Sequence, residues 1–279
     1  MSQNNNSSHY VWLNNRIIPE NSAHISKEDR GFLLGDGVFD TMAAIQGQPI
    51  EAELHFQRLS ENCAIMNLNT GYEQRRWLQQ IEELINKNNL NHKYASIRTT
   101  ITRGRGQRGL LPAKCKSPTI LITAKAFNPH FMARPARVII STKTRRNEGS
   151  PLSQIKSLNY GDNIIARMEA AELGADEALL LNNKNVISCG TSSNVFIAVN
   201  DEVYTPPLSD GVLNGIVRQK ILSMAAPKSR IIEKSITAED AENAKAVFIT
   251  NSLIGIRPVS HLNGTEIPIA EISDIFGDI

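Results

Sequence analysis

The chain has no stretch of about eighteen consecutive apolar residues, which a membrane-spanning helix would need. It also has few cysteines: Cys63, Cys115 and Cys189 are far apart, odd in number and without the C-x-x-C spacing of zinc or redox sites. These absences argue against a membrane protein, a disulfide-rich secreted domain and a cysteine-based metal centre. We therefore expect a reduced, cytoplasmic protein with no metal site and no membrane partner.

An excess of charge of either sign is also missing, because 30 lysines and arginines nearly balance 28 aspartates and glutamates, for a net charge of +2. Proteins whose main partner is a nucleic acid usually carry a strong basic patch or excess. We therefore expect no nucleic-acid partner, whereas a small anionic ligand is compatible with this balance.

What is present is an ordinary globular composition, 41% apolar and 21% charged over 279 residues, enough for one large or two modest domains. The first nine residues are rich in Asn and Ser and are predicted to form a disordered tail. Prolines at 129 and 135 punctuate the chain. We predict a disordered tail over 1–9, an N-terminal α/β domain over 10–126, a linker over 127–134 and a C-terminal domain over 135–279.

Hydrophobic periodicity predicts a mixed α+β fold. In the first half it indicates a strand-turn-strand over 10–19, helices over 54–67 and 73–88, and strands over 94–102 and 119–124. In the second half it indicates strands over 137–141, 177–181, 186–188 and 195–199, and helices over 162–173 and 215–224. The helix over 162–173 is expected to carry Ile164, Ile165, Met168 and Ala171 on one face.

Three segments of the second half stand out for their chemistry. Lys156 lies in a short loop beside apolar residues, and partial burial makes a lysine amine a better nucleophile. The turn Thr191-Ser192-Ser193 offers hydroxyls, and Gly215 opens a helix whose first N–H groups favour a phosphate. Each segment alone also describes a surface lysine, a plain turn or a plain helix start. Together they indicate a site for a phosphorylated aldehyde cofactor.

The line Cys189-x-Thr191-x-x-Asn194-Val195-Phe196, followed by Leu213-x-Gly215-Ile216-x-Arg218, resembles the signature of the fold-type IV pyridoxal-phosphate enzymes. These include branched-chain and D-amino-acid aminotransferases and aminodeoxychorismate lyase, and the resemblance covers nearly the whole chain. It implies a small N-terminal α/β domain, a larger β-rich C-terminal domain with helices, and pyridoxal 5'-phosphate as cofactor. It also implies a small amino-acid-like substrate and a homodimer.

The resemblance also implies roles for single residues. Lys156 takes the place of the Schiff-base lysine, and Arg58 in His55-x-x-Arg58-Leu59 that of the arginine that binds the cofactor phosphate. Tyr160 resembles a tyrosine that lies beside the ring hydroxyl in branched-chain enzymes. The other predicted cofactor-binding residues are Cys189, Thr191, Ser192, Ser193, Asn194, Gly215, Ile216, Val217, Asn251 and Ser252.

Two further segments are similar to aminodeoxychorismate lyase. The Arg-Gly-rich segment 102–109 resembles one whose last arginine meets a substrate carboxylate, which makes Arg108 the predicted substrate-binding residue, with Arg103 or Arg105 as alternatives. A glycine-rich hairpin with solvent-facing arginines remains the simpler interpretation. Phe39-Asp40-Thr41 resembles a segment in which a threonine lies close to the cofactor. We therefore predict that Thr41 assists catalysis and that Phe39 lines the substrate pocket.

Cys189 departs from the family pattern, in which a glutamate at this place pairs with the pyridine nitrogen of the cofactor. A thiol is a weak hydrogen-bond partner, so unless it ionises the ring draws electrons less strongly. Three interpretations remain open: an elimination that depends less on the ring, a thiolate that replaces the carboxylate, and a protein that has lost catalysis. Cys189 is also open to the plain interpretation of a small buried side chain.

The resemblance therefore predicts a pyridoxal-phosphate-dependent enzyme similar to 4-amino-4-deoxychorismate lyase, which eliminates pyruvate to give 4-aminobenzoate, with Lys156 as nucleophile and proton carrier. The first alternative is an aminotransferase that acts on D- or branched-chain amino acids. The second is a non-catalytic protein that binds pyridoxal phosphate.

Overall fold

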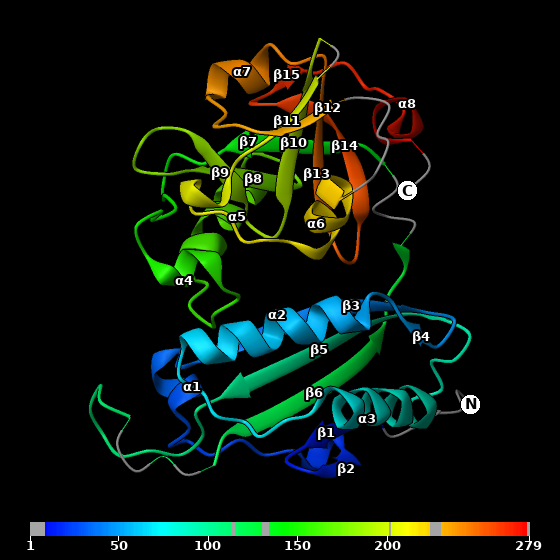
Figure 1. Cartoon of the computed structure of the whole chain (residues 1–279), viewed down its shortest axis with the longest axis vertical. Coiled ribbons are helices and arrows are strands. Elements are labelled where there is room, and N and C mark those ends of the chain that lie inside the picture. The colour runs from blue at the N-terminus through cyan, green and yellow to red at the C-terminus, as the bar shows by residue number, and fades with distance from the viewer. Residues whose placement is uncertain are drawn as a thin grey trace, which may run out of the picture. The chain divides into compact units, whose positions relative to one another are not determined.

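The computed structural model describes residues 9–112, 115, 117–129, 134–200, 202–223 and 230–277, and the chain in it divides into two compact units (Figure 1). The first unit extends to Asn128 and also includes Lys156–Leu158, and the second consists of Pro129–Ile155 and the chain from Asn159 onwards. The division falls within the predicted linker, but Lys156–Leu158 groups with the first unit although it follows the linker in sequence. Residues 1–8 of the predicted tail lie outside the described residues.

The first unit is built on a six-stranded sheet of order β2-β1-β6-β5-β3-β4, in which every neighbouring pair is antiparallel. Side chains alternate along β5: Ala95, Ile97 and Ile101 are buried, as expected for a strand with one face on a core. The strands are β1 (Tyr10–Leu13), β2 (Arg16–Pro19), β3 (Gly37–Ile45), β4 (Gln48–Pro49), β5 (Tyr94–Thr102) and β6 (Thr119–Ala126).

Two long helices, α2 (Ala52–Ile65) and α3 (Gln74–Lys87), lie across this sheet in Figure 1, α2 against β3 and α3 against β1 and β6. The buried residues of α3 are Trp77, Ile81, Leu84 and Ile85, a spacing that places them on one helical face. A short helix, α1 (Arg30–Leu34), precedes β3, and a 3-10 turn spans Glu20–Ser22. The predicted strands and helices of this half are thus confirmed, with ends that shift by two residues or fewer.

The second unit contains a larger mixed sheet of order β12-β11-β10-β13-β14-β7-β8-β9, with β15 on β14. Three pairs, β11 with β12, β14 with β7 and β7 with β8, are parallel. The strands are β7 (Ala136–Ile140), β8 (Glu177–Leu181), β9 (Ile187–Gly190), β10 (Asn194–Val199), β11 (Glu202–Thr205), β12 (Arg230–Glu233), β13 (Ala246–Asn251), β14 (Gly255–Leu262) and β15 (Thr265–Glu266).

Both faces of β10 are buried, which is why its sequence is apolar from Val195 to Val199. Val195 and Ile197 join one core cluster, whereas Phe196 and Ala198 join a second, which includes Phe276. The helices of this unit are α4 (Pro151–Gln154), α5 (Gly161–Glu172), α6 (Ile216–Ser223), α7 (Ala238–Glu242) and α8 (Ile272–Phe276), with a 3-10 turn at Leu208–Asp210. The predicted mixed α+β architecture is confirmed, and no described helix is long and apolar enough to cross a membrane.

Helix α5 forms where predicted, but its apolar face is not the buried one. Ile164 is 58% exposed and Met168 57% exposed, whereas Ala166 and Ala170 are buried against β8. Small residues let the helix approach the sheet closely, so packing selected the alanines rather than the larger side chains. The apolar pattern therefore predicted the helix correctly. It did not predict which side of the helix faces the core.

Candidate functional site

The lysine segment is fixed by strand pairing in the first unit. Phe39 N donates to Lys156 O at 2.8 Å, and Leu158 N donates to Gly37 O at 3.0 Å. Gly37 admits no side chain here, because a Cβ would lie 2.5 Å from the Ile101 carbonyl oxygen. The backbone of Lys156–Leu158 therefore extends the edge of β3, and the position of the lysine is set by the sheet and not by its own loop.

Two cations face the ring of Phe39. The Lys156 Nζ lies 4.5 Å from the ring centroid, and the guanidinium carbon of Arg98 lies 3.7 Å from it. Arg98 is on β5, directly opposite Thr41 of β3. The predicted residues Lys156, Phe39 and Thr41 thus lie in one region of the sheet, with a guanidinium beside them that suits a carboxylate.

Arg98 is not among the residues predicted from the sequence. Its sequence context, a charged residue in an alternating strand, is that of any half-exposed arginine. Only the register of β5 against β3 places it opposite Thr41. Knowledge of how β3 and β5 pair would have identified Arg98, but this pairing cannot be read from a single sequence.

Arg58 is buried in α2 and bound to a buried carboxylate. Its Nε donates to Asp40 Oδ2 at 2.8 Å, and His55 Nδ1 lies 2.5 Å from Asp40 Oδ1. Burial by itself would raise the pKa of Asp40, but the charge of Arg58 and the hydrogen bond of His55 outweigh it and lower the pKa from 3.8 to about 2. Asp40 is thus a charged partner that orients Arg58, whose contact with a phosphate stays a prediction.

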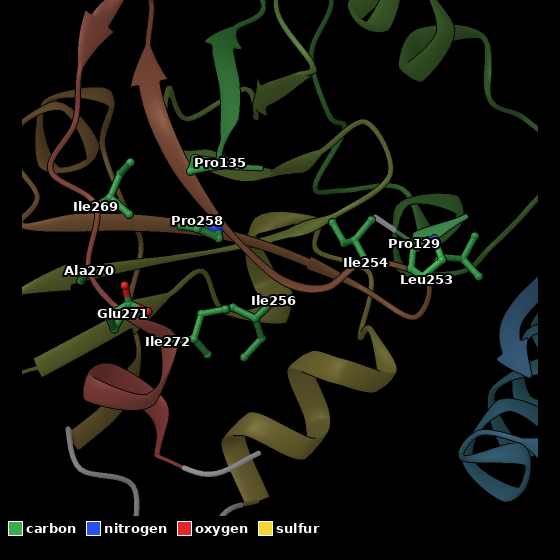
Figure 2. Close-up of a pocket in the computed structure, with 10 residues that line it drawn as sticks. All are labelled: Pro129, Pro135, Leu253, Ile254, Ile256, Pro258, Ile269, Ala270, Glu271 and Ile272. Carbon is green, nitrogen blue, oxygen red and sulfur yellow. The ribbon is translucent and has the colours of Figure 1, made fainter. Parts of the chain in front are cut away.

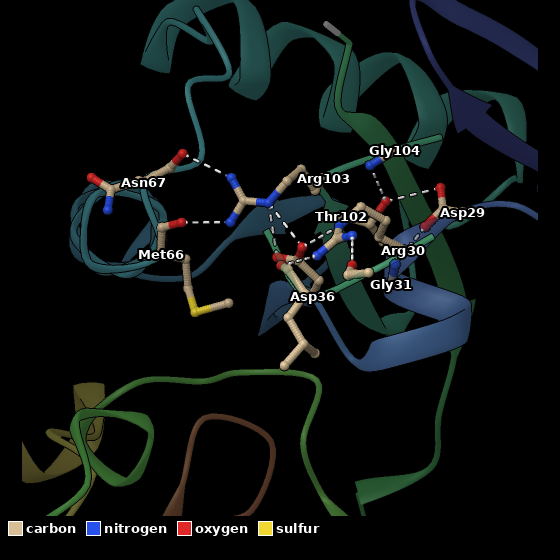
Figure 3. Close-up of polar contacts among 11 residues, drawn as sticks. Asp29, Arg30, Gly31, Asp36, Met66, Asn67, Thr102, Arg103 and Gly104 are labelled. Carbon is tan, nitrogen blue, oxygen red and sulfur yellow. Dashed lines mark hydrogen bonds and ion pairs between the residues drawn. The ribbon is translucent and has the colours of Figure 1, made fainter. Parts of the chain in front are cut away.

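Arg103, a predicted substrate-binding residue, is engaged within the protein (Figure 3). Its Nε donates to Asp36 at 2.9 Å, which also receives Arg30 Nε at 2.7 Å. The other two nitrogens of Arg103 donate to the carbonyls of Asn67 and Met66, at the end of α2. These contacts tie Arg103 to Asp36 and to the end of α2, so a contact with substrate would require it to leave them, and that contact stays a prediction.

Arg108 lies in an exposed loop whose following residues are held by Arg30. The two terminal nitrogens of Arg30 donate to the carbonyls of Gly109 and Leu110, each at 2.8 Å. Arg105 instead pairs with Glu28 at the surface. Arg108 is therefore exposed on a loop anchored next to it, and its contact with a substrate carboxylate stays a prediction.

In the second unit the hydroxyls of Thr191, Ser192 and Ser193 all donate to one buried carboxylate, that of Glu177 in β8. A hydroxyl has one proton to donate. In this structure the three hydroxyls are committed to Glu177, so the predicted contact with a phosphate would require them to leave it. The sequence analysis missed Glu177, because a glutamate at the start of a strand gives no signal of burial.

Cys189 faces an apolar cluster of the second unit. Ser188 is unpaired between the registers Leu180 to Cys189 and Leu181 to Ile187, which marks a β-bulge. The bulge directs the Cys189 side chain to the side of Leu180, where it packs with Ile139, Ala166, Ala170 and Ala178. The residues packed around Cys189 in this cluster are all apolar, and none of them carries a charge.

Hydrogen-bond donors that could bind a phosphate lie at the start of α6. Asn194 Nδ2 donates to Leu213 O at 2.9 Å, just before the helix. Gly215 has no room for a side chain, because a Cβ would lie 2.1 Å from Asn194 Oδ1. The N–H groups of Ile216 and Val217 lie in the first turn of α6, where no acceptor exists within a helix. Asn194 and α6 thus meet in one place, as the motif predicts.

The end of β13 reaches the same place. Thr250 pairs with Asn194 across the strands, and its hydroxyl is buried with no hydrogen-bond partner in the described part of the chain. Next to it, Asn251 ends β13 and Ser252 begins the connection to β14. A buried hydroxyl without a partner costs free energy unless a ligand satisfies it. This donor set fits the phosphate group of the cofactor that the resemblance implies.

Tyr160 lies at the N-terminal end of α5, where its side chain makes no capping hydrogen bond. An apolar pocket of about 500 Å³ lies elsewhere in the second unit, lined by three prolines, by aliphatic residues and by Glu271 (Figure 2). None of the predicted site residues lines it. The pocket nevertheless borders the segment after Ser252, because Leu253 and Ile254 line it.

Comparison with known proteins agrees with these features. The chain is 32% identical over 267 residues to a protein of Methanocaldococcus jannaschii named "Putative branched-chain-amino-acid aminotransferase", with 95% of this chain and 92% of the other covered. It is 28% identical to the D-alanine aminotransferase of Bacillus licheniformis, with 92% and 89% covered. A solved structure from Legionella pneumophila, described as "Putative 4-amino-4-deoxychorismate lyase", superposes with a TM-score of 0.83 at 30% identity, with 91% and 92% covered.

The family described as amino-transferase class IV matches residues 37–262, a span that includes Phe39, Arg58, Lys156, Cys189 and Ser252. Agreement over this span, together with similar solved structures of the same two-unit fold, confirms the predicted fold type. The chain therefore belongs to the class IV amino-transferase family of pyridoxal-phosphate-dependent enzymes.

Proposed function

We propose that this enzyme is a lyase that converts 4-amino-4-deoxychorismate to 4-aminobenzoate and pyruvate. When bound, pyridoxal phosphate supplies an aldehyde that condenses with amines and a ring that draws electrons from the neighbouring carbon. Lys156 would bind the aldehyde carbon, release it to the substrate amine, take the proton of the substrate carbon that carries the amine, and return it to the leaving enolpyruvyl group. The proton ends in the pyruvate methyl group, so the reaction needs no oxidant or water.

The observation that carries this proposal is the environment of Cys189. Its side chain packs among Ile139, Ala166, Ala170, Ala178 and Leu180, and none of these offers a charge to a ring nitrogen. Transamination needs a strong electron sink in both directions, whereas an elimination that yields an aromatic product gains driving force from the product itself. A weakened sink therefore favours elimination over transamination.

The remaining residues have roles that their positions support. Arg98 and Arg108 are candidates for the two substrate carboxylates, because a guanidinium binds a carboxylate in bidentate geometry. Thr41, opposite Arg98, is the candidate that assists near the reacting group. Within the second unit, Thr250, Ser252 and the first turn of α6 are the candidates for the phosphate, and the resemblance also implies Arg58 of the first unit.

The decisive experiment compares both reactions on one preparation loaded with pyridoxal phosphate. We expect formation of 4-aminobenzoate and pyruvate in equal amounts from 4-amino-4-deoxychorismate, and no sustained turnover of D-alanine or L-leucine with 2-oxoglutarate. Steady transamination, with the cofactor accumulating in its amine form, would instead favour the second candidate, an aminotransferase. That candidate draws its support from the relatives named branched-chain and D-alanine aminotransferases.

The variant Cys189→Glu distinguishes an enzyme whose cofactor ring draws electrons weakly from a protein that only binds the cofactor. If the cofactor site is intact, Cys189→Glu should raise transaminase activity by about 10-fold or more, since a carboxylate keeps the ring nitrogen protonated. Cys189→Gln, which is similar in size to the glutamate variant but neutral, is the control. If neither reaction is detected in the wild type or in either variant, the protein binds the cofactor without catalysis.

We also propose that the protein is a homodimer that covers the exposed face of α5. Ile164, Ile165, Met168 and Leu173 are large apolar residues exposed by 45% to 66% on or next to this helix. Such a face is costly in water and is typical of an interface. We expect light scattering to give the mass of two chains for the wild type and of one chain for Ile164→Glu/Met168→Glu. Glu239→Gln, on the separate helix α7, should stay dimeric, and a wild type that is monomeric at micromolar concentration would contradict the proposal.

A further inference from the structure

The carboxylate of Glu177 collects the donors of one turn. Glu177 is 5% exposed at the start of β8, and its Oε1 accepts from the Thr191 hydroxyl and from Thr191 N at 3.0 Å. Its Oε2 accepts from the hydroxyls of Ser193 at 3.0 Å and Ser192 at 3.2 Å, and from Ser192 N at 3.3 Å. A carboxylate has two oxygens and about four lone-pair sites, and accepts hydrogen bonds only. The turn between β9 and β10 is therefore held by hydrogen bonds to the single side chain of Glu177.

The carbonyls of the same turn are held from the opposite direction. Asn163 Nδ2, in the first turn of α5, donates to Thr191 O at 2.7 Å. Asn251 Nδ2, at the end of β13, donates to Ser192 O at 3.1 Å. The N–H and O–H groups of the turn donate to Glu177, and its carbonyls accept from the amides of Asn163 and Asn251. Only one orientation of the turn satisfies all of these groups.

This turn connects the segments that carry the proposed phosphate donors. Asn251 also accepts from Leu253 N and Ile254 N, at 2.9 and 3.0 Å, which shapes the chain around Ser252. Asn194, the residue after the turn, holds the lead-in to α6 through Leu213. A shift of the turn would therefore move both the Ser252 segment and the start of α6.

The turn is tightly packed on the side that faces Glu177. A Cβ on Gly190 would lie 2.1 Å from Ser193 Oγ and 3.2 Å from the carboxyl carbon of Glu177. In a space this tight, an acceptor cannot be replaced by moving the backbone toward another group. The geometry depends on the carboxylate itself.

We propose that Glu177 is a positioning residue of the cofactor site, which sets the phosphate donors of α6 and of the Ser252 segment through the turn it holds. The inference rests on the proposed binding of pyridoxal phosphate. Glutamine at this position would place an NH₂ group against donors of Ser192 and Ser193, so at least one buried donor would lose its acceptor. The turn would then relax and move the donors that depend on it.

A second buried glutamate provides a matched control. Glu169 of α5 accepts from the Ser141 and Thr142 hydroxyls at 2.6 Å each and from the Thr142 N–H at 3.1 Å, so its chemistry is similar, but no residue it touches belongs to the site. Both Glu177→Gln and Glu169→Gln should lower the melting temperature. Only Glu177→Gln should weaken pyridoxal phosphate binding, by about 10- to 100-fold, whereas Glu169→Gln should stay within about threefold of the wild type.

The measurement is a titration of pyridoxal phosphate followed by absorbance, at a temperature where all variants are folded, with the ³¹P resonance of the bound phosphate recorded in parallel. We expect the resonance to shift or broaden in Glu177→Gln alone. Equal affinity and an unchanged resonance in both variants would overturn the inference while leaving the proposed function intact, whereas a wild type that binds no cofactor would overturn the function. If Glu177→Gln does not fold, Asn163→Ala must show the same selective loss.

Discussion

Replacing Lys156 by alanine is expected to abolish both the covalent attachment of pyridoxal phosphate and the reaction. The wild type loaded with cofactor should show an absorption band near 400 nm or at shorter wavelength, according to protonation, and borohydride should fix this band to the protein. Lys156→Ala should show no fixed band, and turnover should fall by at least about 10³-fold, because one amine serves as nucleophile and proton carrier.

The structure indicates that Lys156→Ala should remove the amine without disturbing the fold. Lys156 is placed by backbone hydrogen bonds between its own segment and β3, and these do not involve its side chain. The variant should therefore fold with a melting temperature close to that of the wild type. Lys125→Ala, which removes an exposed lysine of the same unit that pairs with Glu20, is the matched control and should keep the band and the activity. A borohydride-fixed adduct in Lys156→Ala would show that another lysine binds the aldehyde.

The second large effect is expected from Asp40→Asn. The exchange keeps the shape of the side chain but leaves the buried guanidinium of Arg58 without its counter-charge, and loss of one partner of a buried ion pair costs about 3 kcal/mol or more of unfolding free energy. Glu28→Gln removes the carboxylate of an exposed surface pair with Arg105 and should change the unfolding free energy little. Denaturant titrations of the three proteins at pH 7 measure both effects.

The same pair predicts how the difference depends on pH. The pKa of Asp40 is about 2 in the folded protein and 3.8 as its ordinary value, so the carboxylate stabilises the fold fully above about pH 4 to 5. This contribution is lost as the pH falls from there through 2. The gap in unfolding free energy between the wild type and Asp40→Asn should therefore be largest near neutral pH and narrow toward pH 2. A constant gap over this range would mean that Asp40 does not owe its effect to charge.

Asp40→Asn also tests the role of Arg58 in the cofactor site. If Asp40 orients Arg58 toward a phosphate, the variant should bind pyridoxal phosphate at least about 10-fold more weakly under conditions where it is folded. Binding of pyridoxal, which lacks the phosphate, should change little. Equal losses for the two ligands would show that the variant disturbs the site as a whole.

The parts of the fold that could be predicted from sequence are those with strong local patterns. Strand β5 occupies the predicted range 94–102, and α3 differs from its predicted range by one residue at each end. Alternation and 3.6-residue periodicity state which side of an element is apolar, and in these elements the apolar side is also the buried one. In α5 it is not, because the close approach to β8 required alanines and the larger residues remain outside.

The candidate site was predicted in the same uneven way. The motif of Lys156, Asn194 and Gly215 could be recognised because small and charged residues at fixed spacing are rare by chance. Arg103 was predicted to bind substrate, but in the structure its nitrogens donate to Asp36 and to the end of α2, because an arginine next to glycines gives the same sequence pattern whether it faces a ligand or a carbonyl. Glu177 and Arg98 were missed, because each matters only through a partner far away in the chain.

The sequence by itself determined the family, the cofactor chemistry and the departure at Cys189, since these depend on residue identity and on spacing along one chain. Only the tertiary structure decided that the lysine segment completes the edge of β3, that Asp40 holds Arg58, and that Glu177 holds the turn beside Asn194. Each of these is a contact between residues more than ten positions apart. Such contacts are selected by packing and by the need to satisfy every buried polar group, and a local pattern contains neither.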